Sequence, residues 1–545
     1  MIELSPLFAR RISGPALILS LALSPAVVEA GPHRARLSQD LEARLAAGST
    51  GATSVIISGT ETAIRSVAQR YGATVKKSLR GGAVLEVTAG QLEALTSDPD
   101  VAHLSGDARV QRMTAATTEA TGAPQVWSGI AGLRGFSGQG VGVAVIDSGV
   151  AGEHSALRRH LVDTLDFTGK KGTAADRFGH GTHVAGIIAG TDDAGEYSGL
   201  APGAHIVSLK VLGPDGSGDT SDVINAIDWA IEHKASHALR VINLSLGRPV
   251  FESYREDPLC RAVQRAVDAG LVVVAAAGNM GKTVDGRPIV GAVMAPGSCP
   301  STLTVGALNT GATVQRSDDV VATYSSRGPT AIDGLLKPDV VAPGNKIVAA
   351  AAPGSFLVQT YPDRIVAGQG ANAYIQFSGT SMAAAEVSAV TALMLEANPS
   401  LTPADVKLLL QVTSSPVSGA GLIEAGAGSI NAAAAVALSV APTASVPSIT
   451  IGGETVAMSR TASLTGTTIE SVARYSSLGK VIVIPQTIVW GETIVWGETI
   501  VWGETIVWGE TIVWGETIVW GETIVWGETI VWGETIVWGE IQRDE

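Results

Sequence analysis

The chain has 545 residues, of which 46% are hydrophobic and 16% are charged, and its formal net charge is −14. This length exceeds that of one ordinary domain and indicates about two to four domains with a large buried core. Nine of the glutamates fall in a C-terminal repeat, between Glu492 and Glu540, so the rest of the chain carries a charge of only −5. A nearly balanced charge argues against a nucleic-acid-binding protein, whose footprint would be basic.

Residues 1–30 are organised like a secretory signal peptide. Arg10 and Arg11 form a positively charged start, and residues 16–22 form a short apolar core. Residues 28–30, Val-Glu-Ala, supply the small-residue cleavage site that such signals need. The apolar run is too short for a helix that crosses a membrane. We therefore expect an exported protein, extracellular or periplasmic, although the paired arginines leave the twin-arginine route open.

Residues 31–115 alternate short strands and short helices. The patterns predict three strands and two helices, at Ser54–Ser58, Ala83–Val87 and Val101–Leu104, and at Glu61–Tyr71 and Ala89–Leu95. Such an alternation within about 80 residues is typical of a small α+β domain. It leaves two interpretations open, a pro-region and an independent accessory domain. The small and polar residues 111–123 form a flexible boundary suited to proteolytic processing.

From about residue 140 to residue 397, apolar strands alternate with helices. The strands are predicted at Gly142–Ile146, His205–Val211, Val241–Leu244 and Val272–Ala276. The helices are predicted at Ser221–His233, Leu259–Ala269 and Ser381–Ala397. This alternation predicts an α/β domain, assigned to residues 121–440, in which a parallel sheet is flanked by helices.

Three short motifs in this domain carry the residue types of a Ser-His-Asp catalytic triad. Asp147 ends the apolar run Val-Ala-Val-Ile, at the strand edge where open α/β sheets place their sites. His180 opens His-Gly-Thr-His-Val-Ala-Gly, and Ser381 opens a helix, where unpaired N–H groups and the helix dipole favour a nucleophile. In a triad, aspartate orients histidine, histidine moves the proton and serine attacks. His183 is the competing base, and a metal site at His180 and His183 lacks a third ligand.

The order Asp147, His180, Ser381, with Ser-Gly-Thr-Ser-Met-Ala around the serine, resembles the subtilisin-like serine peptidases, or subtilases. The resemblance extends over about residues 122–436. It implies a subtilisin-like fold and a secreted endopeptidase that works through an acyl-enzyme. It also implies that residues 31–115 are an inhibitor-like propeptide, which makes the chain a zymogen. The Asn279 amide and the Ser381 N–H would bind the oxyanion.

The same resemblance places the substrate groove. Residues 212–218 and 245–247 match the two segments that hold an extended peptide between them by backbone pairing. The substrate-binding residues implied are Gly216, Ser217, Gly218, Ser245, Leu246, Gly247, Ala277, Gly278 and Met294. Met294 stands in a loop where the family commonly has glycine. It predicts a shallow pocket that prefers a medium-sized apolar side chain before the cleaved bond.

The helix that follows the nucleophile departs from the family pattern at two positions. Ala385 stands where proline is usual, and Glu386 brings a carboxyl group close to the site. The first change removes a residue that presets φ near a helix start, and the second adds a carboxyl group that could perturb His180. The sequence leaves open a helix that tolerates both changes, slower hydrolysis, and a shift toward acyl transfer to amines.

The expected chemistry needs no cofactor. Members of the family often bind structural calcium, but the sequence does not assign its ligands among Asp192, Asp193, Asp215 and the other carboxylates.

The two cysteines are Cys260 and Cys299, and both a disulfide and two buried thiols fit an exported protein.

The C-terminal part is of a different kind. Residues 441–486 are rich in small and polar residues at their start and are predicted as a linker. Residues 487–540 repeat Thr-Ile-Val-Trp-Gly-Glu, with nine tryptophans from Trp490 to Trp538. A β-solenoid or stacked short hairpins would fit this repeat. It is either an element for self-association or surface attachment or a poorly ordered tail, and we assign it no chemistry. The rival to a protease is thus a weakened subtilase-fold surface protein that presents the repeat.

Overall fold

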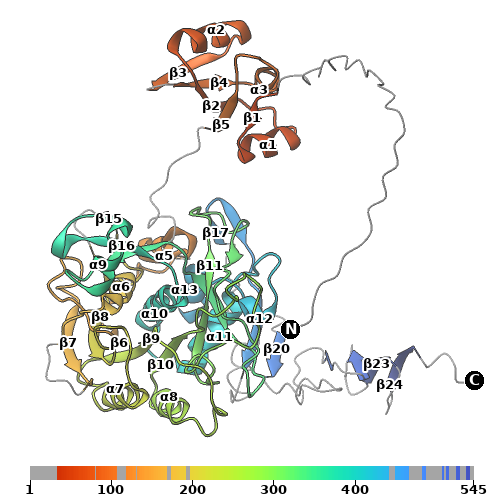
Figure 1. The fold of residues 1–545 in the computed structure, drawn as a ribbon. Coiled ribbons are helices and arrows are strands. Elements are labelled where there is room, and N and C mark those ends of the chain that lie inside the picture. The colour runs from red at the N-terminus through yellow and green to blue at the C-terminus, as the bar shows by residue number, and fades with distance from the viewer. Residues whose placement is uncertain are drawn as a thin grey trace, which may run out of the picture. The chain divides into compact units, whose positions relative to one another are not determined.

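The computed structural model describes residues 34–79, 82–106, 118–130, 132–168, 174–191, 197–440 and 449–464, and the backbone of five short strands beyond them. The chain divides into two compact units, Met1–Val110 and Gln111–Glu545, drawn in Figure 1. The predicted signal peptide lies outside the described residues, as do residues 107–117 around the predicted processing region.

The first unit is a five-stranded sheet with helices, and its strands run in the order β1-β5-β2-β4-β3. Its elements are β1 (Arg36–Leu37), α1 (Gln39–Ala46), β2 (Thr53–Ser58), α2 (Glu61–Tyr71), β3 (Thr74–Leu79), β4 (Gly82–Val87), α3 (Ala89–Thr96) and β5 (His103–Gly106). Ile64, Leu85 and Leu92 are buried in its core. The sequence pattern does not predict β3, because all six of its residues are exposed and the strand is held by its pairing with β4.

The second unit is built on an eight-stranded, mostly parallel sheet with the order β12-β11-β10-β9-β6-β8-β7, in which β13 also pairs with β11. Its strands are β6 (Gly142–Asp147), β7 (Leu161–Asp166), β8 (His205–Lys210), β9 (Leu239–Leu244), β10 (Val272–Ala276), β11 (Leu303–Asn309), β12 (Val320–Val321) and β13 (Val340–Pro343). The pairing of β11 with β12 is antiparallel. This is the predicted α/β architecture.

Helices lie on the two faces of the sheet (Figure 1). Alternate strand residues belong to two separate hydrophobic cores, one on each face. On one face, Val143 and Val145 of β6 share a core with α5 (Ala123–Ser128), α6 (His180–Ala189), α10 (Thr380–Ala397), α11 (Pro403–Thr413) and α13 (Ala432–Val440). On the other face, Ala144 and Ile146 share a core with α7 (Thr220–Glu232) and α8 (Pro258–Asp268). Because both faces are covered, β6 is buried along its whole length.

A smaller sheet and several short helices complete the second unit. The sheet has the order β14-β16-β15. These elements are β14 (Ile347–Ala350), α9 (Phe356–Thr360), η1 (Pro362–Arg364), β15 (Ile365–Ala367), η2 (Gly370–Asn372), β16 (Tyr374–Phe377) and α12 (Leu422–Ala425).

The structure differs from the predicted linker at residues 441–486. Part of that stretch forms three strands, β17 (Ile449–Ile451), β18 (Glu454–Val456) and β19 (Thr461–Leu464). Ile449 and Ile451 are buried in the larger core of the second unit. The Thr450 carbonyl accepts a hydrogen bond of 2.6 Å from Gln125 Nε2. Two buried isoleucines and this hydrogen bond thus attach part of a polar stretch to the second unit.

The described strands of the C-terminal tail are β20 (Ile482–Pro485), which pairs with β19, and β21 (Ile506–Val507), β22 (Thr511–Trp514), β23 (Thr523–Gly527) and β24 (Thr535–Gly539). The last four form one sheet in chain order. β23 and β24 are parallel, and identical repeat positions face each other from Thr523↔Thr535 onward. No helix in the described parts of the chain is both long and apolar enough to span a membrane.

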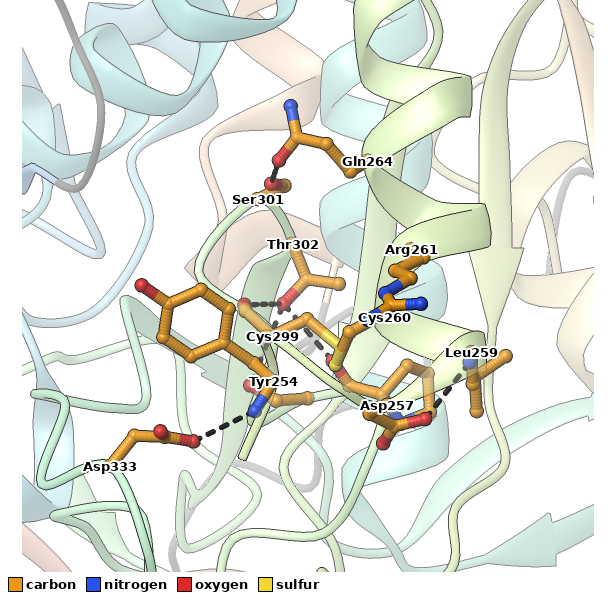
Figure 2. Close-up of a disulfide and its surroundings, with 12 residues drawn as sticks. Tyr254, Asp257, Leu259, Cys260, Arg261, Gln264, Cys299, Ser301, Thr302 and Asp333 are labelled. Atoms are coloured by element: carbon orange, nitrogen blue, oxygen red, sulfur yellow. Dashed lines mark hydrogen bonds between the residues drawn. A yellow bond between two sulfur atoms is a disulfide. The ribbon is translucent and has the colours of Figure 1, made fainter. Parts of the chain in front are cut away.

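Cys260 and Cys299 form a disulfide, so the structure decides between the bridge and the two free thiols (Figure 2). Their Cα atoms lie 5.4 Å apart. Cys260 lies in the first turn of α8, which Asp257 caps by accepting a 2.9 Å hydrogen bond from the Leu259 N–H. On the other side, Thr302 Oγ1 donates to the Cys299 carbonyl at 2.7 Å. The bridge therefore joins α8 to the loop that precedes β11.

We expect that loss of this disulfide lowers the free energy of unfolding by about 2–4 kcal/mol, because the bridge joins residues 39 positions apart and restricts the unfolded chain. The measurement is equilibrium urea denaturation of a Cys260→Ser/Cys299→Ser variant beside the natural chain. As a control, a reductant should lower the midpoint of the natural chain to that of the variant and leave the variant unchanged. Equal midpoints without reductant would contradict the expectation.

Candidate active site

Asp147 lies at the carboxyl end of β6, and its side chain is completely buried. Because the strand before it is buried on both faces, the position of the carboxylate is fixed by the sheet. Oδ1 accepts a hydrogen bond of 2.7 Å from the Ser148 N–H. Both carboxylate oxygens contact His180 Nδ1, at 2.8 and 2.9 Å. This contact holds the imidazole with Nδ1 as the donor, and Nε2 is then the nitrogen that can accept a proton.

His180 is the first residue of α6 and lines an open cavity. Gly179 before it has a φ of 105°, where a side chain would also collide with Ser355. Burial by itself lowers the pKa of His180, but the charge and hydrogen bond of Asp147 and the charge of Asp176 raise it above its usual value overall. The site therefore stabilises the imidazolium form, as a general base requires.

Ser381 lies in the first turn of α10, a helix that is buried from residue 380 to residue 395. Its Oγ donates to the Ser245 carbonyl at 3.1 Å, and Ser245 Oγ donates to the Ser381 carbonyl at 2.8 Å. Among the hydrogen bonds of the described residues, none joins Ser381 Oγ to His180. The hydroxyl must therefore rotate to reach the imidazole, and such bonds often form only when substrate is bound.

Asn279 follows β10 and is tied to the residue before the nucleophile. Its Oδ1 accepts hydrogen bonds from Thr380 N at 2.9 Å and from Thr380 Oγ1 at 3.1 Å. Thr380 Oγ1 also accepts a 3.1 Å hydrogen bond from the Gly278 N–H. Because two donors hold Oδ1, the Nδ2 group of the exposed amide is directed away from Thr380. The arrangement places an amide donor beside the start of α10.

A cavity of about 380 Å³ opens beside His180. Six of the predicted substrate-binding residues line it, namely Gly216, Ser217, Gly218, Ser245, Leu246 and Gly247. Leu212 and Ala295, which also line it, lie in or beside segments that the resemblance assigned to the groove, whereas five further lining residues were not predicted, namely Phe178, Thr220, Val223, Arg248 and Leu259. Most of these five lie in or near α6, α7 and α8, and no local sequence signal separates them from ordinary helix and loop residues.

Arg248 lines this cavity and pairs with Ala295, another of its lining residues. The N–H and carbonyl of Arg248 pair with the carbonyl and N–H of Ala295, at 2.8 and 2.9 Å. Its guanidinium lies 2.8 Å from the buried Oδ1 of Asp257, at the cap of α8. The charge in the cavity wall is therefore compensated by a carboxylate rather than left for a ligand.

Ala277, Gly278 and Met294 do not line that cavity but form a second contact next to it. Met294 N donates to the Ala277 carbonyl at 2.9 Å. A Cβ placed on Gly278 would lie 2.7 Å from Met294 Cγ, and one placed on Gly247 would lie 3.1 Å from Met294 Cβ. The Met294 side chain thus fills space between two glycine backbones.

His183 lies in the core, on the side of α6 that faces β16. It is completely buried, and its Nε2 is 3.1 Å from the Ile375 carbonyl. Burial lowers the pKa of His183 to about 3, so the ring is neutral at physiological pH. Its position agrees with a structural role and not with that of the general base.

The described residues contain no group of three His, Cys, Asp or Glu side chains that could hold a metal ion. Asp215 lies in an exposed turn, where Oδ1 accepts a 3.1 Å hydrogen bond from the Ser217 N–H. Asp192 and Asp193 lie outside the described residues. The calcium ligands that the sequence left unassigned therefore stay unassigned.

Glu386 is completely buried in α10, and neither of its carboxyl oxygens has a hydrogen-bond partner within the described structure. Burial raises the pKa of Glu386 well above its usual value, which favours the neutral acid. The charges that raise the pKa of His180 are those of Asp147 and Asp176, and Glu386 is not among them. A neutral carboxyl group has no charge with which to act on the imidazole.

Comparison with known proteins gives a consistent set of relatives. The sequence profile of the Subtilase family matches residues 138–463, a range that includes all of the site residues above. Serine protease AprX of Bacillus subtilis (strain 168) is 35% identical over 355 residues, or 64% of this chain and 77% of that protein. Subtilisin E of the same strain is 32% identical over 353 residues, or 64% of this chain and 80% of that protein. The solved structure of sphericase, at 29% identity, covers 57% of this chain and 97% of its own, with a TM-score of 0.46.

The burial of Glu386 predicts a stability that falls as the pH rises. Because its pKa is raised in the folded chain, the folded chain keeps a proton that the unfolded chain releases above about pH 4.5. A Glu386→Gln variant should match the natural chain near pH 4 and exceed it at pH 8, and the gap should grow by up to about 1.4 kcal/mol per pH unit between the two pKa values.

The measurement is the urea midpoint of each chain from pH 4 to pH 9. Glu232→Gln serves as the control, since Glu232 is exposed near the end of α7 and its replacement should leave the pH dependence unchanged. If Glu386→Gln and the natural chain kept a constant gap over that range, the buried neutral acid would be the wrong account.

Proposed function

The chain belongs to the Subtilase family and is a subtilisin-like serine endopeptidase, and on that premise we propose that Ser381, His180 and Asp147 form its catalytic triad. The observation that carries this proposal is the contact of both Asp147 oxygens with His180 Nδ1 at 2.8 and 2.9 Å. Ser381 is connected to the same cavity through Ser245, which lines it.

In the proposed reaction, Ser381 Oγ forms a bond to the substrate carbonyl carbon while its proton passes to His180 Nε2. The C–N bond then breaks, and the proton moves from His180 to the leaving amine. Water releases the acyl group by the same route, giving its proton first to His180 and then to Ser381 Oγ. Asp147 keeps the imidazole in the required tautomer and stabilises the imidazolium in both steps.

We further propose that Asn279 Nδ2 and the Ser381 N–H stabilise the oxyanion of each tetrahedral intermediate. The support is the pair of hydrogen bonds from Thr380 that turns the Asn279 carbonyl oxygen away and leaves the amide as donor. A preorganised donor of this kind typically contributes about 3–4 kcal/mol to the transition state.

The proposed substrate is a peptide in extended conformation. The segments 216–218 and 245–247 both line the cavity, and their backbones would pair with the peptide as neighbouring strands. Met294 contacts Gly247 and Gly278, and at this position it would take up space that a large side chain before the cleaved bond needs. We therefore propose that small and medium-sized apolar side chains are preferred there.

Export and synthesis as a zymogen are part of the same proposal. The disulfide suits an oxidising compartment, and the first unit has a core of its own, as an inhibitor-like propeptide needs. Removal of that unit after folding would yield the mature enzyme, and residues 111–122 are the proposed region of cleavage.

We expect the natural chain, produced in a host that exports it, to lose its first unit and to hydrolyse a denatured protein substrate. A Ser381→Ala chain should keep residues 31–115 attached and show no hydrolysis, because the attacking oxygen is absent. N-terminal sequencing and a fluorogenic protein assay measure both properties. An exported Ser381→Ala chain that is cleaved like the natural one would show that another protease removes the first unit, and equal hydrolysis by both would contradict the assigned nucleophile.

The pocket assignment predicts that Met294→Gly admits larger side chains before the cleaved bond. The ratio of kcat/KM for a phenylalanine substrate to that for an alanine substrate should rise about 10- to 100-fold, because the thioether no longer fills the space between Gly247 and Gly278. Matched peptides that differ only at this position provide the measurement. Val290→Ala, at an exposed position near Met294, is the control and should leave the ratio unchanged. A constant ratio in Met294→Gly would place the pocket elsewhere.

A further inference from the structure

A second buried carboxylate lies beside the triad, and the reaction described above does not use it. Asp176, in the segment that leads into α6, is 6% exposed. Its Oδ1 accepts hydrogen bonds from Ser148 Oγ at 2.8 Å and from the Gly179 N–H at 2.7 Å. Its Oδ2 accepts hydrogen bonds from Thr182 N at 2.9 Å and from Thr182 Oγ1 at 2.6 Å. Four donors thus surround one carboxylate.

Asp176 acts as the cap of the helix that carries His180. The position before the helix is Gly179, which has no side chain to accept from the first N–H groups of α6. Asp176 accepts from two of the N–H groups at this helix start instead, and its negative charge lies near the positive end of the helix dipole. The backbone that positions the imidazole is therefore held by this side chain.

The same carboxylate is connected to Asp147 through Ser148. The Ser148 N–H donates to Asp147 Oδ1 at 2.7 Å, and its hydroxyl donates to Asp176. The hydroxyl oxygen in turn accepts a 3.0 Å hydrogen bond from the Gly181 N–H, within the first turn of α6. Ser148 and Asp176 together join the end of β6 to the start of α6, the two elements whose side chains must meet.

The charged and titratable groups near His180 are few in the described structure. Asp147 and Asp176 both raise the pKa of His180. His183 lies on the same helix, and because burial lowers its pKa it is neutral. Lys210 of β8 directs its ammonium to the Ala175 carbonyl at 2.7 Å, next to Asp176 in the chain. Burial raises the pKa of Asp176 above its usual value overall, and the hydrogen bonds from Thr182, Gly179 and Ser148 oppose only part of that shift.

We propose that Asp176 is a positioning residue for proton transfer, which fixes the first turn of α6 against the turn after β6 and adds its charge to the stabilisation of the imidazolium. The inference rests on the proposed triad. A carboxylate is needed because each of its oxygens accepts from a backbone N–H. An asparagine would turn an NH₂ group toward one of those N–H groups and leave it unpaired.

The test is the pH dependence of kcat and kcat/KM of mature Asp176→Asn on a peptide substrate. We expect kcat to fall about 10- to 100-fold with KM almost unchanged, because the imidazole is misplaced and the bound peptide is not. We also expect the acidic limb of the kcat/KM profile to move to lower pH, because the imidazolium loses one stabilising charge. A kcat within twofold of the natural enzyme, or an acidic limb that does not move, would overturn the proposal.

Asp405→Asn is the matched control, since Asp405 is also buried and its carboxylate also accepts a backbone N–H and a hydroxyl at a helix start, those of Thr402 in the capping box of α11. It should lose stability while kcat and the acidic limb stay unchanged, and an equal effect on kcat from both variants would also overturn the proposal. If Asp176→Asn does not fold, Ser148→Ala is measured instead, and we expect its kcat to fall about 3- to 10-fold. An unchanged kcat in Ser148→Ala would overturn the proposal. A natural enzyme without hydrolytic activity would instead refute the proposed triad itself.

Discussion

The contact between the Asp147 carboxylate and His180 Nδ1 is the interaction on which the rest of the site depends. It joins the last residue of β6 to the first residue of α6, so both elements must be held rigidly for it to exist. The sheet supplies one half of this rigidity, because β6 is buried on both faces. Asp176 supplies the other half, because it caps α6 and is hydrogen-bonded to the turn after β6. The remaining parts of the site are arranged around this contact.

Those parts come together because the strands are parallel and adjacent. The order β10-β9-β6-β8 places four carboxyl ends side by side along one edge of the sheet. Asn279 follows β10, the segment 245–247 follows β9, Asp147 ends β6, and the segment 212–218 follows β8. A peptide that lies along this edge would meet the two groove segments, the proposed base and the proposed oxyanion donor in one place. Helix α10 brings Ser381 to that edge from one side of the sheet.

The features that sequence could predict are those with a local signal. Continuous apolar runs predicted four of the eight strands of the larger sheet, β6, β8, β9 and β10, to within two residues. Three motifs predicted the residues that the fold brings to the carboxyl edge of that sheet. Features held by distant partners had no such signal: β3 is exposed and paired at an edge, and Ile449 and Ile451 lie in a polar stretch. Asp176 is one carboxylate among many in the sequence, and only its four donors in the folded chain distinguish it. The cysteine pairing likewise required the fold, since 39 residues separate the two.

The most direct test of the account is the reaction of the purified protein with a fluorophosphonate, followed by mapping of the adduct by mass spectrometry. The account predicts one adduct, on Ser381, whose rate of formation falls as the pH drops below the pKa of His180, and whose formation is nearly abolished in His180→Ala. A folded chain without its first unit that stays unlabelled, or that is labelled on another serine, would contradict the catalytic role of this triad.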